Sequence, residues 1–177
     1  MKNKTIFLDR DGTINLNKNG YVHKIEDLEF IPQSLDGLKK LQGVGYSLII
    51  ITNQSGIGKG YYTERDYFNF RAEFHKRLMK EGVFLTAEYF CPHNPDDKCS
   101  CRKPETGMLE QAAYDFILDL NNCWMIGDKD SDILAGKKAG CKTIHVLTGE
   151  SKKVYDADFT AKNLVEAADY ILENDNK

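Results

Sequence analysis

Short apolar runs alternate with helical patterns along almost the whole chain, and this alternation is the strongest constraint on its fold. The runs are rich in β-branched and aromatic residues, which is typical of strands buried on both faces of a parallel sheet. The segments between them carry apolar residues at helical spacing. We therefore expect an α/β fold with a doubly wound, mostly parallel sheet. The expected strands are 5–8, 46–51, 87–90, 124–126 and 143–147, and the expected helices are 34–42, 64–80, 108–118, 130–139 and 163–172.

Length and composition point to a single domain over residues 1–177 with a sizeable core. The net charge of −3 gives no basic footprint for nucleic acid, and no apolar run is long enough for a membrane span. The polar start leads directly into a strand, so we expect no signal peptide. An odd set of five cysteines does not suit a disulfide scaffold and favours a reducing compartment. We expect a cytoplasmic monomer that binds neither nucleic acid nor membrane.

Two aspartates, Asp9 and Asp11, stand where the first strand ends. Ligands of an open α/β sheet bind at the carboxyl ends of its strands. A turn at Gly12 would swing both carboxylates toward one site, where they would repel unless a divalent cation or a proton neutralised them. This predicts a nucleophile, a proton carrier and a hard metal ion in one place. The alternative is an Asx-turn or a helix cap.

A glycine-rich segment, Thr52–Gly60, follows the second expected strand. Small hydroxyl and amide side chains with three glycines let a backbone approach an anion closely. The segment is interpreted as a phosphate cradle, the alternative being a flexible loop.

A third carboxylate, Asp128, follows the fourth expected strand and is the best candidate for another metal-facing oxygen. Asp130 or Ser131 is expected to cap the next helix. Asp132 is expected to brace Lys129 or the loop backbone.

Three thiols and one imidazole lie within eleven residues: Cys91, His93, Cys99 and Cys101. This set predicts a closed, structural zinc site that folds the loop 91–101. Chance clustering or a redox disulfide is the alternative. Cys123 and Cys141 stand beside apolar runs and are expected in the core.

A basic pair, Arg102 and Lys103, follows this cluster and precedes Pro104. Exposed basic pairs are usually solvated, but one fixed by a metal loop becomes a rigid anion clamp. Two cations beside a carboxylate metal site suggest a substrate with more than one phosphate.

With Asp9-x-Asp11-Gly12-Thr13, Thr52, Lys103 and Gly127-Asp128 in this order, the chain resembles the haloacid dehalogenase superfamily of phosphohydrolases. The Cys/His cluster followed by Arg-Lys-Pro is similar to the branch of histidinol phosphatases and heptose-bisphosphate phosphatases. The resemblance implies a Rossmann-like fold of the haloacid dehalogenase type without a separate cap domain. The loop after the first strand and the zinc loop would then wall the site.

The resemblance also implies roles. Asp9 would attack phosphorus, and Asp11 would protonate the leaving oxygen and then deprotonate water. Mg²⁺ would be held by Asp9, the Asp11 carbonyl and Asp128. Thr52 and Lys103 would bind the transferring phosphoryl group. Arg102 would hold the remote phosphate, and the sugar would be bound by Lys18, Asn19, Gly20, Tyr21, Asn53, Gln54, Ser55 and Lys129.

Three functions remain open at this point. The branch implies hydrolysis of a phosphate monoester through an aspartyl-phosphate, with the 7-phosphate of a heptose 1,7-bisphosphate as the expected target. Histidinol phosphate is the alternative substrate. A non-catalytic sugar-phosphate sensor would have no need of a nucleophile, so the complete acidic set argues against it.

Overall fold

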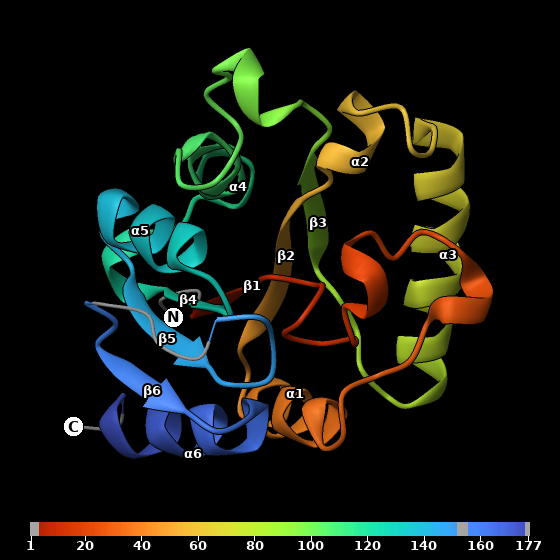
Figure 1. Cartoon of the computed structure of the whole chain (residues 1–177). Helices are drawn as coiled ribbons and strands as arrows, with labels where there is room; N and C mark the ends of the chain where they lie inside the picture. Colours follow the sequence, from red (N-terminus) through yellow and green to blue (C-terminus); the bar gives the residue numbers. More distant parts are fainter. Residues whose placement is uncertain (1–3, 152–155, 176–177) are drawn as a thin grey trace.

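The computed structural model describes residues 4–151 and 156–175. Its six strands form one sheet in the order β3-β2-β1-β4-β5-β6 (Figure 1). Each neighbouring pair is parallel, so every connection crosses over the sheet. The strands are β1 (Thr5–Leu8), β2 (Ser47–Asn53), β3 (Ala87–Cys91), β4 (Trp124–Gly127), β5 (Lys142–Val146) and β6 (Phe159–Ala161).

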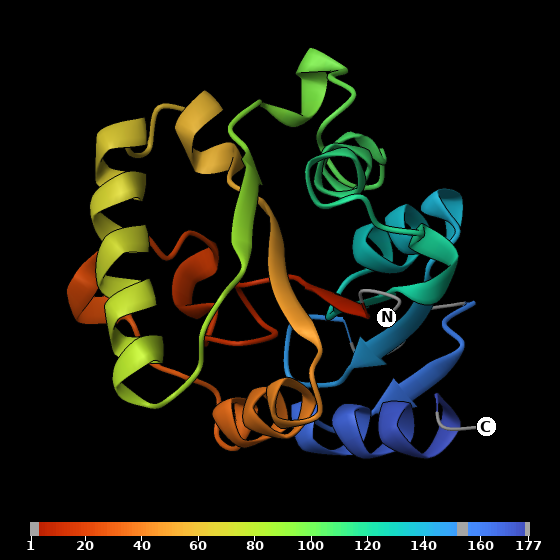
Figure 2. The same ribbon diagram turned by 180° about the vertical axis from the view of Figure 1, so that it is seen from behind.

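The helices cover both faces of this sheet, as Figures 1 and 2 show from opposite sides. The α-helices are α1 (Ser34–Gly43), α2 (Ser55–Gly58), α3 (Glu64–Lys80), α4 (Gly107–Phe116), α5 (Asp130–Ala139) and α6 (Leu164–Asn174). Short 3₁₀ turns are η1 (Lys18–Gly20), η2 (Ile25–Asp27), η3 (Pro95–Asp97) and η4 (Leu120–Asn122).

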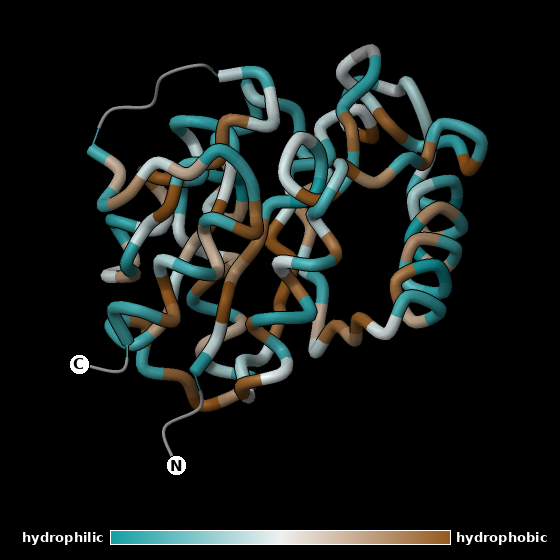
Figure 3. The backbone as a smooth tube through the Cα atoms, turned by 90° about the horizontal axis from the view of Figure 1, so that it is seen from below, coloured by the Kyte–Doolittle hydropathy of each residue, from teal (hydrophilic) through white to brown (hydrophobic). Residues whose placement is uncertain are grey.

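Successive side chains of the central strands pack into two separate cores. In β1, Ile6 and Leu8 belong to the core beneath α1, α3 and α6, whereas Phe7 packs toward α4 and α5. The alternation follows from the period of two along a strand. In Figure 3, brown apolar stretches run through the interior and teal covers much of the periphery. The sheet is therefore buried on both faces, as the apolar runs predicted.

The expected doubly wound α/β fold is confirmed, and the ends of the expected strands and helices shift by two residues at most. The strand β6 and the short helix α2 were not predicted. β6 has three residues, and its pairing with β5 defines it. The backbone of α2 is fixed by tertiary bonds, because Gln54 and Gly58 donate N–H groups to the carbonyls of Cys91 and Pro92. Neither element has a local pattern strong enough to be predicted from its own residues.

None of the helices in the described residues is long and apolar enough to cross a membrane.

Candidate active site and metal centre

The site lies at the topological switch point of the sheet, where β1 and β4 are neighbours but their connections leave in opposite directions. Asp9 directly follows β1, and its N–H donates to the carbonyl of Ile126 in β4 at 2.9 Å. Asp128 directly follows β4. Carboxylate oxygens of Asp9, Asp128 and Asp132 lie within 4.8 Å of one another. The strand order thus brings together acids that are more than a hundred residues apart in sequence.

Gly12 permits the turn that places this acidic group. Its φ of +91° lies in the left-handed region, which disfavours residues with a side chain. A Cβ at this position would also lie 2.6 Å from Asp128 Oδ2. Both the backbone conformation and the close approach therefore require glycine between the first two aspartates and the third.

Lys103 is buried beside Asp9, with 2.9 Å between Nζ and Oδ1. Its ammonium also lies 2.6 Å from Asp132 Oδ1 and donates to the carbonyl of Ile51 at 2.6 Å. Burial alone would lower the pKa of Lys103, but the attraction of Asp132 and Asp9 outweighs burial and raises it. Lys103 is therefore a fixed positive charge at the acidic group.

The ion pair of Asp132 with Lys103 was not predicted from the sequence. The second carboxylate oxygen of Asp132 accepts the N–H of Lys129 at 3.0 Å, so the expected bracing of the loop backbone is confirmed. The expected cap by Asp130 or Ser131 is wrong, because Lys129 is the N-cap residue of α5. The third helical position, not the first or second, supplies the capping carboxylate here.

The segment after β2 orders the site through its side-chain amides. Asn53 both donates to the carbonyl of Lys103 and accepts its N–H, at 3.0 and 3.1 Å. Gln54 donates to Asp11 Oδ2 at 3.0 Å and to Thr52 Oγ1 at 2.8 Å, and accepts from Tyr62 at 2.7 Å. These two amides hold catalytic candidates in place and also line the cavity, so their expected contact with a sugar stays a prediction.

Arg10, between the two motif aspartates, is fully buried and was not singled out from the sequence. Its guanidinium donates to both carboxylate oxygens of Asp11, at 3.1 and 2.8 Å. It also donates to the carbonyl of Val22 and lies 4.7 Å from the ring centre of Phe70. The sequence signal was present, since a charged residue directly after a buried strand needs a partner.

The site opens into a cavity of about 350 Å³. The loop after β1, with Asn17 and Tyr21, and the loop after β3, with Pro95, form part of its wall, as expected of a fold without a cap. The predicted site residues that line this cavity are Asp9, Asp11, Gly20, Tyr21, Thr52, Asn53, Gln54, Ser55, Arg102, Lys103 and Lys129.

Two predicted substrate residues are not placed in the cavity. Lys18 does not line it and forms an ion pair with Glu29 instead. Asn19 belongs to the turn η1, and its side chain lies outside the described part of the structure. Lining residues that sequence reasoning missed are Asn17, Lys59, Tyr62, Pro95, Ser131, Asp132 and Glu150.

The acidic group is electrostatically suited to a divalent cation. Burial, together with the negative charges of Asp9 and Asp132, raises the pKa of Asp128 to about 8. Asp128 Oδ1 is buried and has no hydrogen-bond partner among the described residues. Crowded carboxylates with an unpaired buried oxygen are the donor type that Mg²⁺ prefers. These residues therefore fit a hard metal ion.

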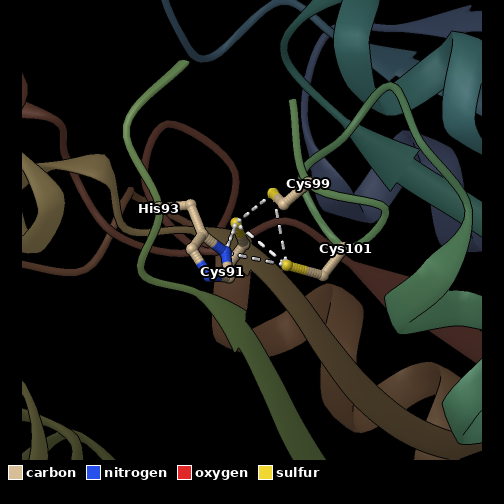
Figure 4. Close-up of side chains that lie close together, drawn as sticks. All are labelled: Cys91, His93, Cys99 and Cys101. Atoms are coloured by element: carbon tan, nitrogen blue, oxygen red, sulfur yellow. Dashed lines mark hydrogen bonds between the residues drawn. The ribbon is translucent and has the colours of Figure 1, made fainter. Parts of the chain in front are cut away.

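The four predicted zinc ligands come together at one end of the sheet (Figure 4). Cys91 Sγ lies 3.5 Å from His93 Nδ1, 3.6 Å from Cys99 Sγ and 3.3 Å from Cys101 Sγ. Thiolates on a tetrahedral zinc ion, with Zn–S bonds of about 2.3 Å, lie about 3.8 Å apart. The donor set therefore fits a closed tetrahedral metal site. As expected, Cys123 and Cys141 lie outside it and are buried in the core.

Known proteins with a similar sequence or structure identify the class of protein to which this fold and site belong. The protein-family model described as HAD-hydrolase-like matches residues 100–174. A crystal structure of D,D-heptose 1,7-bisphosphate phosphatase from B. bronchiseptica, complexed with magnesium and phosphate, superposes with a TM-score of 0.90. It is 30% identical and covers 96% of this chain and 98% of its own.

Curated relatives match along almost their whole length. D-glycero-β-D-manno-heptose-1,7-bisphosphate 7-phosphatase from Helicobacter pylori strain J99 is 44% identical over 170 residues, 96% of this chain and 97% of its own. D-glycero-α-D-manno-heptose-1,7-bisphosphate 7-phosphatase from Campylobacter jejuni is 42% identical over 175 residues, 99% of this chain and 99% of its own. The chain therefore belongs to the phosphatases of the haloacid dehalogenase superfamily. Within them, it belongs to the family of the D-glycero-D-manno-heptose-1,7-bisphosphate 7-phosphatases.

Proposed function

We propose that this chain hydrolyses D-glycero-D-manno-heptose 1,7-bisphosphate and releases the 7-phosphate. One observation carries the proposal: a single cavity holds the Asp9–Lys103 pair at the acidic group and also Arg102, a cation with no carboxylate partner among the described residues. A substrate with two phosphates would present one phosphate to Lys103 at the acidic group and the other to Arg102. The names of the relatives from H. pylori and C. jejuni support this substrate.

The reaction begins with attack by the Asp9 carboxylate on the phosphorus of the 7-phosphate. A bond forms between an Asp9 oxygen and phosphorus, and the bond from phosphorus to the sugar oxygen breaks. Asp11 gives its proton to that oxygen and later takes one from the water that hydrolyses the aspartyl-phosphate. Lys103 and Thr52 bind the transferring group, where positioning and charge neutralisation account for most of the rate.

The magnesium site in this proposal consists of the Asp9 carboxylate, the Asp11 carbonyl and the Asp128 carboxylate. The raised pKa and the unpaired oxygen of Asp128 support it. When bound, Mg²⁺ neutralises charge on the phosphoryl oxygens. The chain's own contribution is the fixed geometry that Gly12, Asn53 and Lys103 give to the acidic group.

The Cys/His set is proposed as a structural zinc site. Four donors leave no open position for substrate, which favours a structural role over a catalytic one. The loop 91–101 has the 3₁₀ turn η3 as its only regular element after β3 ends, and η3 has no buried residues. A metal ion therefore supplies the cross-link that the loop's own packing does not.

Arg102 is proposed to bind the remote phosphate, and the sugar is proposed to contact Gly20, Tyr21, Ser55 and Lys129. All five line the cavity. Lys18 and Asn19 remain proposed contacts from the same loop. We further propose that the chain acts as one domain over 1–177, as a monomer, in the cytoplasm. Its five free cysteines, including the proposed zinc ligands, support a reducing compartment.

The decisive measurement is steady-state phosphate release with Mg²⁺ from heptose 1,7-bisphosphate, in both C1 anomers, and from histidinol phosphate. We expect kcat/KM for the better heptose anomer to be at least about tenfold higher than kcat/KM for histidinol phosphate. A factor of this size corresponds to the free energy of one charge-assisted phosphate contact. A preference for histidinol phosphate would contradict the proposed substrate. Binding without turnover of any phosphate ester would favour the sugar-phosphate sensor.

A further inference from the structure

Among the residues that the structure describes, four cationic side chains line the cavity, and they differ in how their charge is compensated. Lys103 pairs with Asp9 and Asp132, and Lys129 pairs with Glu150 at 3.4 Å. Lys59 and Arg102 form no ion pair with a carboxylate in the described ranges 4–151 and 156–175. Two of the four charges are therefore available to an anionic ligand.

Lys59 is held at this cavity by an aromatic wall. Its Nζ donates to the hydroxyl of Tyr21 at 2.8 Å and lies 5.5 Å from the centre of the Tyr21 ring. Tyr21 in turn packs edge-on against Tyr61, with ring centres 4.9 Å apart. An exposed lysine usually moves freely in solvent, whereas this one has an acceptor that also lines the cavity.

The loop 91–101 holds Lys59 and Arg102 near each other. Gly58, directly before Lys59, donates its N–H to the carbonyl of Pro92 at 2.9 Å. A Cβ on Gly58 would lie 2.5 Å from the backbone nitrogen of Asn94, so the two segments are in close contact. Arg102 directly follows Cys101 of the same loop. The Cys/His cluster therefore anchors both segments that carry the unpaired cations.

The two cations also interact electrostatically. The hydrogen bond to Tyr21 raises the pKa of Lys59, and the nearby charge of Arg102 opposes that rise. Two like charges close together repel each other when no counter-ion is present. An anion bound between them attracts both, and the total electrostatic energy then becomes favourable. This is an arrangement that a doubly charged phosphate would complete.

We propose that Lys59 is a specificity-determining residue that binds the uncleaved phosphate of the substrate together with Arg102. The inference rests on the proposed function, because it needs a substrate with two phosphates. Lys59 supplies a point charge oriented by Tyr21, and Arg102 supplies a guanidinium fork. The cluster at 91–101 then sets the spacing of the two.

The test compares Lys59→Gln with the wild type on heptose 1,7-bisphosphate and on heptose 7-phosphate. We expect the ratio of the two kcat/KM values to fall about three- to fivefold, through KM for the bisphosphate. Lys59→Arg should restore most of the ratio. Lys80→Gln, which removes an exposed charge at the end of α3, is the matched control and should leave the ratio unchanged. Raising the salt concentration should narrow the difference between wild type and Lys59→Gln.

An unchanged ratio in Lys59→Gln would overturn the inference, and so would an equal loss on both substrates. Failure of the proposed function has a different signature, in which the wild type itself does not turn over heptose bisphosphate. The same comparison would then be made with whichever sugar bisphosphate the wild type hydrolyses and with its monophosphate. A drop in that ratio would support the role of Lys59, and no drop would refute it.

Discussion

Asp132 and Lys103 form a buried ion pair, with 2.6 Å between Oδ1 and Nζ, that holds the lysine ammonium against Asp9. Both side chains are almost completely buried. A buried lysine without a partner would lose its charge or leave the site, so Asp132 keeps the charge where the phosphoryl group is proposed to bind.

Asp132→Ala should therefore lower both activity and stability. Removing one member of a buried ion pair costs about 3–5 kcal/mol, and in Asp132→Ala only Asp9 is left to compensate the charge of Lys103. We expect kcat to fall more than KM rises, since Lys103 is proposed to act in the transition state. Asp130→Asn changes an exposed acid on the same helix and is the control. Wild-type kcat in Asp132→Ala would refute this role.

Asp9→Asn should abolish turnover and leave the fold intact, because an amide cannot attack phosphorus. Asp11→Asn should be nearly inactive at steady state but should still accumulate some phosphoenzyme from an ester with a good leaving group. Acid-quench labelling with a ³²P-substrate, together with circular dichroism, distinguishes the two variants. Substantial turnover by Asp9→Asn would exclude Asp9 as the nucleophile.

The stability of the metal-free protein should depend on pH through Asp128. Burial and the charges of Asp9 and Asp132 raise its pKa from 3.8 to about 8, so the folded state binds this proton more tightly than the unfolded state. The contribution of Asp128 to stability is therefore complete below its unfolded pKa and is lost as pH rises toward about 8.

We accordingly expect Mg²⁺ to raise Tm more at pH 8 than at pH 6, because at pH 6 the ion competes with a bound proton. Asp128→Asn should raise the Tm of EDTA-treated protein at pH 8 and abolish the response to Mg²⁺. Thermal melts at both pH values, with and without Mg²⁺, are the measurement. An equal Mg²⁺ effect at both values would contradict this assignment.

The structural role of zinc should be experimentally separable from the dependence of activity on Mg²⁺. Elemental analysis of protein purified without added metal should find about one zinc per chain. Brief EDTA treatment should remove Mg²⁺ and suppress activity reversibly while zinc stays bound. Cys99→Ala should lose zinc and lower Tm, whereas Cys123→Ala, a buried cysteine outside the cluster, should keep its zinc. Zinc-free protein with full activity and unchanged melting would rule out the structural site.

Substitutions of Arg102 and Lys103 should have different kinetic effects, although the two residues are adjacent in sequence. Lys103→Ala should lower kcat for every phosphate ester, because Lys103 lies at Asp9. Arg102→Ala should lower kcat/KM for the bisphosphate roughly ten- to hundredfold, the worth of a charge-assisted pair, and affect a 7-monophosphate little. Kinetics on both substrates measure the difference. Equal losses in Arg102→Ala would mean that Arg102 serves the catalytic centre or the loop fold.

The sequence by itself determined the fold class and the main elements, because both depend on short-range patterns. An apolar run such as Thr5–Leu8 or an amphipathic stretch such as Glu64–Lys80 carries its own periodicity. The Cys91–Cys101 cluster was visible for the same reason, since its four donors are close in sequence. The local pattern also predicted a nucleophile at the Asp9/Asp11 pair and an anion clamp at Arg102 and Lys103, and the family resemblance then implied a specific role for each of these residues.

Only the tertiary structure decided which side chains hold these groups in place. Asp132 reaches Lys103 because it lies in the first turn of α5, directly after β4, and β4 pairs with β1. Asn53 meets the backbone of Lys103 across fifty residues. Such contacts depend on how strands are ordered in the sheet, and that order is a property of the whole chain, not of any segment in it.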